Sequence, residues 1–144
     1  MKIAKLSAKE YLRQLRRLDV EIKAKLDECE WVRNMATRTG ANLSSDRVSG
    51  GRRATSKIED YVVKLVTLEE ALHRDVANLA KLKKEVMAKI NSLEVSDYRT
   101  LLTMRYVKGL TWEEIAVNMS FSYRHTLRIH GAALTEFEII YKGA

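Results

Sequence analysis

The stretch that decides the fold of this chain reads Thr111-Trp-Glu-Glu-Ile-Ala-Val-Asn-Met-Ser-Phe-Ser-Tyr-Arg-His-Thr-Leu-Arg-Ile-His130. Thr111 and Glu114 have the spacing of a capping box, which predicts a helix that begins directly after Thr111. Residues 120–121 interrupt the helical pattern, and Ser122 is suited to cap a new helix. The stretch therefore predicts two helices that are joined by a tight turn.

The second of these helices has one apolar face and one polar, cationic face. The residues at inward-facing positions are Thr126, Ile129, Ala133, Leu134 and Phe137. The outward-facing ones are Tyr123, Arg124, Leu127 and Arg128. This layout is typical of a DNA-reading helix-turn-helix, whose second helix enters the major groove with its N-terminal end first. An ordinary helical hairpin in a small bundle is the alternative, because caps and apolar spacing occur in any helical protein.

Two sets of candidate DNA-binding residues follow. Arginine can bind two acceptors of guanine at once, a contact worth about 1–3 kcal/mol of discrimination, and an exposed leucine can pack on a thymine methyl group. The base-reading candidates are therefore Tyr123, Arg124, Leu127 and Arg128. The phosphate-contacting candidates are Thr111, Ser122, His125, His130, Arg47, Arg52 and Arg53. Ser122 has the simpler alternative role of a helix cap, and both histidines the alternative of surface or boundary residues.

This C-terminal segment resembles region four of bacterial sigma factors. The resemblance covers residues 98–141 and includes Leu102, the Arg105-Tyr106 pair and the Gly109-Leu110-Thr111 run. It implies a domain that reads a promoter element, with residues 123, 124, 127 and 128 at the groove-facing positions.

A resemblance over nearly the whole chain is to the ArpU/RinA-type regulators of Gram-positive phages. It rests on Ala8-Lys-Glu-Tyr-Leu12, Arg105-Tyr106, Ser122-Tyr-Arg, Arg128-Ile-His130 and Ala133-Leu134. It implies an N-terminal helical region before a sigma-like helix-turn-helix, and a role as an activator of late phage transcription.

The first part of the chain is expected to form two long helices. The first covers about residues 7–37, with apolar residues spaced three and four apart: Tyr11, Leu15, Leu18, Ile22, Cys29, Val32 and Ala36. The second covers about residues 57–93 with a seven-residue repeat: Ile58, Leu65, Leu72, Leu79, Val86 and Leu93. Such stripes bury one narrow face against another helix. Residues 1–94 are therefore expected to form an antiparallel helical hairpin, or a coiled coil with a second copy, that mediates self-association.

Residues 39–55 lie between these two helices and contain three of the six glycines of the chain. This composition predicts a flexible basic loop. Its arginines are candidates for contacts with DNA phosphates, and a plain connector is the alternative.

Residues 95–144 are expected to form a tri-helical domain with helices over 96–108, 112–119 and 122–141. Ser96 is suited to cap the first helix, and Gly109 to end it, since glycine suits the left-handed residue after a helix. No strand pattern competes anywhere in the sequence. The predicted fold class is all-α, with the long helical hairpin or coiled coil followed by a tri-helical helix-turn-helix domain.

Composition narrows the class of protein. The chain has 144 residues, no proline, one cysteine (Cys29) and a net charge of +7. Residues 1–57 hold 14 Lys or Arg against 7 Asp or Glu, so most of the excess cation lies before the helix-turn-helix. A single cysteine excludes an internal disulfide and a multi-cysteine zinc cluster. No apolar run approaches the roughly 18 residues of a membrane span, and no signal peptide is apparent, so a cytoplasmic protein without membrane contact is expected.

The sequence predicts neither an enzyme nor a cofactor site. His73, His125 and His130 have no metal-binding spacing, and there is no glycine-rich phosphate loop or nucleophile elbow. The predicted function is that of a phage or prophage DNA-binding regulator that acts on double-stranded DNA as a homodimer or higher oligomer. The alternatives are a small terminase-like DNA-packaging subunit and an adaptor that binds RNA polymerase without reading DNA.

Overall fold

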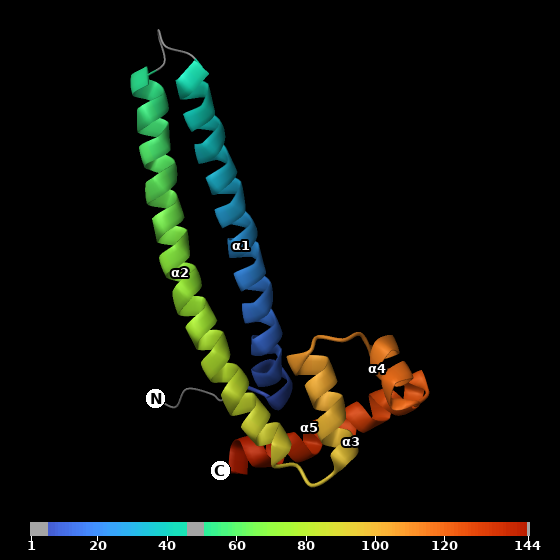
Figure 1. Cartoon of the computed structure of the whole chain (residues 1–144). Helices are drawn as coiled ribbons and strands as arrows, with labels where there is room; N and C mark the ends of the chain where they lie inside the picture. Colours follow the sequence, from blue (N-terminus) through green and yellow to red (C-terminus); the bar gives the residue numbers. More distant parts are fainter. Residues whose placement is uncertain (1–5, 46–50, 144) are drawn as a thin grey trace. The chain divides into compact units, whose positions relative to one another are not determined.

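The computed structural model describes residues 6–45 and 51–143, apart from the side chains of 42–45, 51, 52 and 54. Its elements are α1 (Ala8–Ser45), α2 (Gly51–Asn91), α3 (Ser96–Leu102), the π-helical turn η1 (Thr103–Val107), α4 (Trp112–Met119) and α5 (Tyr123–Gly143) (Figure 1). The described part of the chain contains no strand, which confirms the all-α fold class. A long pair of helices precedes several shorter ones. Within the described residues, no helix combines the length and the apolar character that crossing a membrane requires.

The start of α1 is set by a complete capping box. The Ser7 Oγ accepts a hydrogen bond from the Glu10 backbone N–H at 3.2 Å, and the Glu10 carboxylate accepts one from the Ser7 N–H at 3.3 Å. This exchange satisfies two backbone donors that the first helical turn leaves open. The predicted helix start near Ser7 is confirmed.

The predicted flexible loop over residues 39–55 is wrong for the described residues of that range. α1 extends to Ser45 and α2 begins at Gly51, while residues 46–50 lie outside the description. Residues 38–45 are helical, and the Thr39 side chain bonds along the helix, since its Oγ1 donates to the Met35 carbonyl at 2.8 Å. The physical reason is that glycine costs a helix only about 1 kcal/mol relative to alanine, whereas proline, which removes a donor, is absent.

The chain divides into two compact units, and α1 and α2 contribute to both. Unit 1 comprises residues 1–19 and 79–144, and unit 2 comprises residues 20–78. The boundary predicted near residue 94 therefore falls inside unit 1 rather than between two units.

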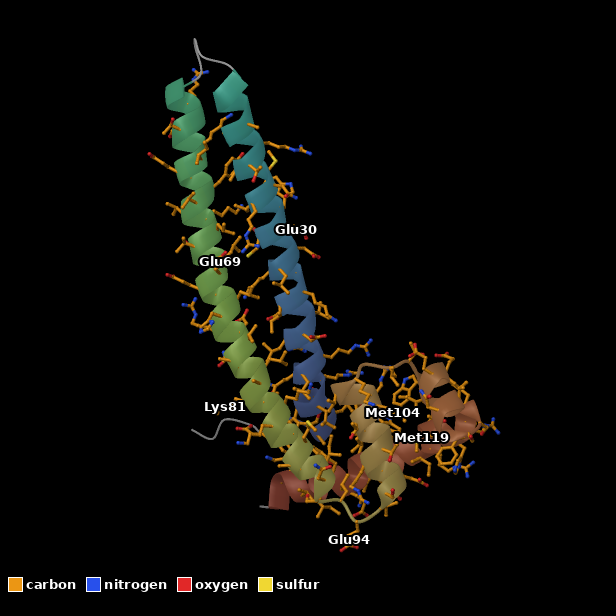
Figure 2. All side chains as sticks on the ribbon, in the orientation of Figure 1. Glu30, Glu69, Lys81, Glu94, Met104 and Met119 are labelled. Carbon is orange, nitrogen blue, oxygen red and sulfur yellow. The ribbon has the colours of Figure 1, made fainter. Side chains whose placement is uncertain are left out.

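Unit 2 consists of α1 from Val20 onward and of α2 up to Asn78, and the two helices run antiparallel (Figure 1). Between the described parts of the two helices, three ion pairs are formed: Lys25–Asp75, Glu28–Lys64 at 3.7 Å and Arg33–Glu69 at 2.7 Å. Charged side chains project along both helices, among them Glu30 on α1 and Glu69 on α2 (Figure 2). Exposed ion pairs contribute about 0–1 kcal/mol each, so they set the register of the hairpin more than its stability. Only three described residues of this unit are buried apolar ones: Ile22, Cys29 and Val32.

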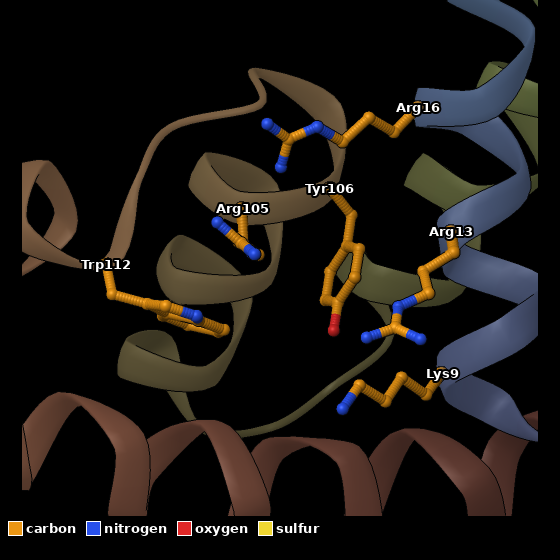
Figure 3. Close-up of a pocket in the computed structure, with 6 residues that line it drawn as sticks. All are labelled: Lys9, Arg13, Arg16, Arg105, Tyr106 and Trp112. Atoms are coloured by element: carbon orange, nitrogen blue, oxygen red, sulfur yellow. The ribbon is translucent and has the colours of Figure 1, made fainter.

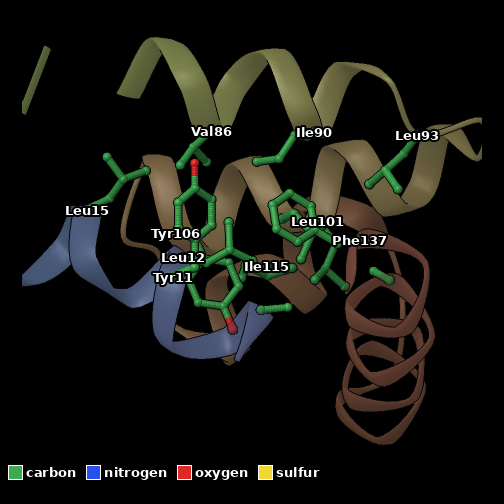
Figure 4. Close-up of a cluster of buried hydrophobic side chains, with 13 residues drawn as sticks. Tyr11, Leu12, Leu15, Val86, Ile90, Leu93, Leu101, Tyr106, Ile115 and Phe137 are labelled. Carbon is green, nitrogen blue, oxygen red and sulfur yellow. The ribbon is translucent and has the colours of Figure 1, made fainter. Parts of the chain in front are cut away.

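Unit 1 contains the hydrophobic core, which draws on every one of its helical elements (Figure 4). Its buried members are Ala8, Tyr11, Leu12, Leu15, Val86, Ile90, Leu93, Leu101, Leu102, Tyr106, Ile115, Ala133 and Phe137. Full burial of one large apolar side chain contributes about 1.5–3 kcal/mol. The base of the hairpin thus packs with the predicted tri-helical domain, because about fifty residues alone bury too little apolar surface for a stable core.

The connection between α2 and α3 differs from the prediction at one residue. The residue that precedes α3 is Val95, with extended backbone angles and no side-chain cap, so the prediction that Ser96 caps this helix is wrong. Arg99 stabilises the connection instead, since its guanidinium Nη1 donates to the carbonyls of Leu93 at 2.5 Å and Glu94 at 3.0 Å. An arginine fork offers several donors at fixed angles, which a serine hydroxyl cannot.

Candidate nucleic-acid interface

The helix that precedes the candidate recognition helix begins as predicted. Thr111 has extended backbone angles (φ −73°, ψ 162°), and its Oγ1 accepts a hydrogen bond from the Glu114 N–H at 3.2 Å. α4 then begins at Trp112. Thr111 is exposed, so its hydroxyl remains accessible to a ligand while it caps the helix.

The turn between α4 and α5 is a Schellman motif with serine in the left-handed position. The Phe121 N–H donates to the Ala116 carbonyl at 2.9 Å, and the Ser120 N–H donates to the Val117 carbonyl at 3.2 Å. Ser120 has φ 57° and ψ 39°, a region that normally favours glycine. Only residues 120–122 separate α4 from α5, and the two helices contact each other.

α5 is capped by Ser122 in the way that the sequence suggests. The Ser122 Oγ accepts from the His125 N–H at 3.1 Å, and the Ser122 carbonyl accepts from the Thr126 N–H at 2.9 Å. The Thr126 Oγ1 donates to the same carbonyl at 2.9 Å, so this fully buried hydroxyl is satisfied within its own helix. A threonine in the interface between α4 and α5 therefore leaves no unpaired polar group.

The four base-reading candidates all lie on the exposed face of α5. Tyr123 and Leu127 are 49% and 39% exposed, and Arg124 and Arg128 are also exposed. Residues 126, 133 and 137, on the opposite face, are buried. Gly131 continues the exposed face by one turn, and a Cβ there would meet no atom within 4 Å. The result is an open helical face with two guanidinium groups, one phenol and one apolar side chain.

Among the phosphate-contacting candidates, His130 does not lie on the surface. Its side chain is 8% exposed, its Nε2 lies 2.7 Å from the Tyr106 hydroxyl, and its ring meets the Trp112 ring edge-on at 4.4 Å. Burial, followed by the charges of Lys9, Arg105 and Arg13, lowers the pKa of His130 to about 4. A neutral, buried imidazole does not contact phosphate, so this prediction is wrong. Residue 130 lies four positions after the buried residue 126 and three before the buried residue 133, so helical spacing alone places it on the inward face, and this signal was missed.

The remaining phosphate-contacting candidates lie on different elements. His125 is half-buried at the start of α5, where its ring packs edge-on against Phe121 at 4.6 Å. Arg53 is exposed in the first turn of α2 in the described chain. The side chain of Arg52 and the whole of Arg47 lie outside the described residues.

A cluster of cationic side chains in unit 1 was missed by the sequence reasoning. Lys9, Arg13 and Arg16 from α1 line a pocket with Arg105, Tyr106 and Trp112 (Figure 3). The available signal was the spacing of the three α1 cations at i, i+4 and i+7, which puts them on one helix face. Pairing that face with residues about 90 positions later needed the tertiary structure.

Comparison with known proteins gives a family and no function. A family model described as "Protein of unknown function (DUF1492)" matches residues 38–138. No curated protein and no solved structure matches the chain.

Proposed function

The chain belongs to the DUF1492 family of unknown function, and we propose that it is a sequence-specific DNA-binding transcriptional regulator. In this proposal the exposed face of α5 enters the major groove, and α4 crosses the DNA backbone. The resemblance to regulators of phage transcription supports a role in phage or prophage gene activation.

The observation that carries the proposal is the two-sided character of α5. Tyr123, Arg124, Leu127 and Arg128 are exposed together at the N-terminal end of the helix, while its other face is buried in the core of unit 1. This is the end that a recognition helix presents to base edges. The tight turn at Ser120 and the two capped helix starts support the same reading, because they hold α5 at a defined angle to α4.

Self-association through unit 2 is the second part of the proposal. Among the described residues of this unit, seven large apolar side chains are exposed: Val20, Leu26, Trp31, Val62, Val63, Val66 and Val76. A second copy of the hairpin that covered them would present two α5 helices to spaced half-sites. Two-site binding raises the affinity for DNA above that of a single α5 helix.

Selection of binding sequences from random duplex DNA with the full chain tests the proposal, followed by measurement of the Arg124→Ala variant. We expect this variant to bind the selected sequence more weakly by about 1–3 kcal/mol, roughly 5- to 150-fold, with a smaller effect on random DNA. Arg74→Ala is the matched control, since Arg74 is exposed on α2. Equal losses on all sequences, or the absence of any enriched sequence, would refute base reading by α5.

A further inference from the structure

The pocket in unit 1 that faces the cationic side of α1 has a lining of unusual composition (Figure 3). Lys9, Arg13 and Arg16 come from α1, Arg105 and Tyr106 from η1, and Trp112 from the start of α4. Four of the six lining residues are cations, and none is acidic. We name this site the α1–η1 pocket.

The cations of this pocket are not neutralised by the protein. Within residues 6–45 and 51–143, no ion pair joins Lys9, Arg13 or Arg16 to a carboxylate. Like charges at i and i+4 destabilise a helix by a few tenths of a kcal/mol, so the arrangement carries a cost without a ligand.

Arg105 is affected by its burial and by the neighbouring cations of the pocket. Burial and then the charge of Arg16 lower the pKa of Arg105, with a further contribution from Arg13, while Tyr106 and Glu113 raise it. The pocket therefore has a positive potential that an anion would relieve.

Arg105 is held in place, whereas the α1 cations are exposed side chains. The Arg105 Nη1 donates to the Leu110 carbonyl at 3.0 Å, and the guanidinium carbon lies 4.3 Å from the centre of the Trp112 ring. The π-helical turn η1 contains both Arg105 and Tyr106, and such turns are frequent at functional sites. One fixed guanidinium and three adaptable cations around it form a suitable cradle for an anion.

The volume of the pocket limits the size of that anion. It measures about 110 Å³, well below the roughly 300–1,000 Å³ of pockets that enclose whole small-molecule ligands. It has room for several water molecules, or for one tetrahedral oxyanion, but not for a nucleoside. A single phosphate group combines this size with the charge that the four cations favour.

We propose that the α1–η1 pocket binds one phosphate group, supplied by the DNA backbone. The source rests on the proposed function: the first helix of a helix-turn-helix crosses the DNA backbone, and Trp112 at the start of α4 forms one wall of the pocket. Residues at the start of α1 thus act as a phosphate anchor beside the helix that reads the bases.

The salt dependence of DNA binding tests the anchor. The full chain carrying Arg13→Gln and Arg16→Gln is titrated against a duplex of random sequence at several salt concentrations. The slope of log affinity against log salt is negative, and loss of one phosphate contact reduces its magnitude by about 0.9. The drop in affinity from 50 to 200 mM salt therefore becomes about 3.5-fold smaller. Arg17→Gln is the matched control, because Arg17 is an exposed neighbour on α1 that does not line the pocket, and we expect its slope to stay closer to that of the wild type.

A second titration distinguishes a phosphate group of the DNA backbone from a free phosphate ligand. In a Trp31→Phe background Trp112 is the remaining tryptophan, and its emission reports on the pocket directly. Inorganic phosphate and pyrophosphate are the probes. A saturable response that Arg13→Gln removes, without any change in the DNA slope, would keep the phosphate site and assign it to a free ligand.

The remaining outcomes distinguish the two proposals. If the DNA slopes of the pocket variant and the Arg17 control agree and phosphate leaves Trp112 unaffected, the phosphate site is refuted, whatever α5 does. If the pocket variant has a salt slope of smaller magnitude but no sequence is preferred over random DNA, the phosphate anchor is supported and base reading by α5 is refuted. Circular dichroism checks that each variant keeps the helical content of the wild type.

Discussion

His130 shows how a single side chain couples the core of unit 1 to the cationic pocket. Its Nε2 is hydrogen-bonded to the buried Tyr106 hydroxyl, while burial and then the charges of Lys9, Arg105 and Arg13 lower its pKa. Protonation would place a further positive charge in an already cationic, buried site. The neutral form is therefore the one that the folded protein accommodates at pH 7.

We expect the stability of unit 1 to fall between about pH 6.5 and pH 4. The pKa of His130 is about 4 in the folded chain against 6.5 for an ordinary histidine, so the unfolded chain binds the extra proton in this interval. Stability is complete above pH 6.5 and declines as the pH falls, by up to about 3 kcal/mol from this one group. Urea denaturation at several pH values measures the decline.

His130→Gln should flatten this decline relative to the wild type, since glutamine retains a polar group near Tyr106 but does not titrate. His73→Gln serves as the control, because His73 is exposed on α2. Identical pH profiles for the wild type and His130→Gln would contradict the assignment.

At the scale of elements, the turn between α4 and α5 holds a serine in an unfavourable backbone conformation that nearby hydrogen bonds stabilise. Ser120 is the only non-glycine residue with a positive φ in the described chain. A left-handed conformation costs a residue with a Cβ about 1–2 kcal/mol, and the Schellman hydrogen bonds offset that cost. The same conformation at Gly109, with φ 71°, carries no such penalty.

We expect substitutions at Ser120 and Gly109 to change the free energy of unfolding in opposite directions. Ser120→Gly should raise the free energy of unfolding by up to about 1 kcal/mol, because the relief of the left-handed strain exceeds the entropy lost by glycine. Gly109→Ala should lower it by about 1–2 kcal/mol; a Cβ there would meet no atom within 4 Å, so the cost is conformational alone. Thermal or urea denaturation of the two variants measures both. A stabilised Gly109→Ala would show that the turn can rearrange.

At the scale of the whole molecule, the two units differ in how completely they bury their apolar residues. Unit 1 contains the core cluster, whereas unit 2 buries only Ile22, Cys29 and Val32 among its described apolar residues, although both units expose a similar number of large apolar side chains. Unit 2 therefore buries a smaller share of its apolar side chains within one chain. A second copy that covered its exposed valines would supply the missing burial, and this is the reason to place self-association in the hairpin.

We expect a dimer of about 33 kDa in light scattering coupled to size-exclusion chromatography, twice the 16.5 kDa of the chain. Val62→Glu together with Val66→Glu should give the monomer mass, because carboxylates oppose burial of this face. Thr67→Glu, at another exposed position of α2, is the control. A wild-type monomer would remove the two-half-site scheme and favour the polymerase adaptor, and a ring-sized oligomer would favour a packaging subunit.

The sequence by itself determined where most of the helices lie, the caps at Thr111 and Ser122, and the exposed face of α5. Each depends on residues within about one or two helical turns, such as Thr111 with Glu114 or Ser122 with residue 125, so local spacing is sufficient. The heptad stripes likewise predicted two long helices that each bury a narrow face, but they left open whether the two pair within one chain or with a second copy. The excess of glycine and serine in residues 39–55 was misleading, because a polar composition weakens a helix without preventing its hydrogen bonds.

Only the tertiary structure decided which distant segments share a core and a pocket. Packing of Leu12 and Ile90 with Leu101 draws the base of the hairpin into unit 1. The same packing buries His130 and brings Lys9, Arg13 and Arg16 to Arg105 and Trp112. Helical periodicity states which face of α1 is cationic, but not what that face meets. The hydrophobic effect that selects the partner is non-directional, and burial of the whole apolar set determines the pairing.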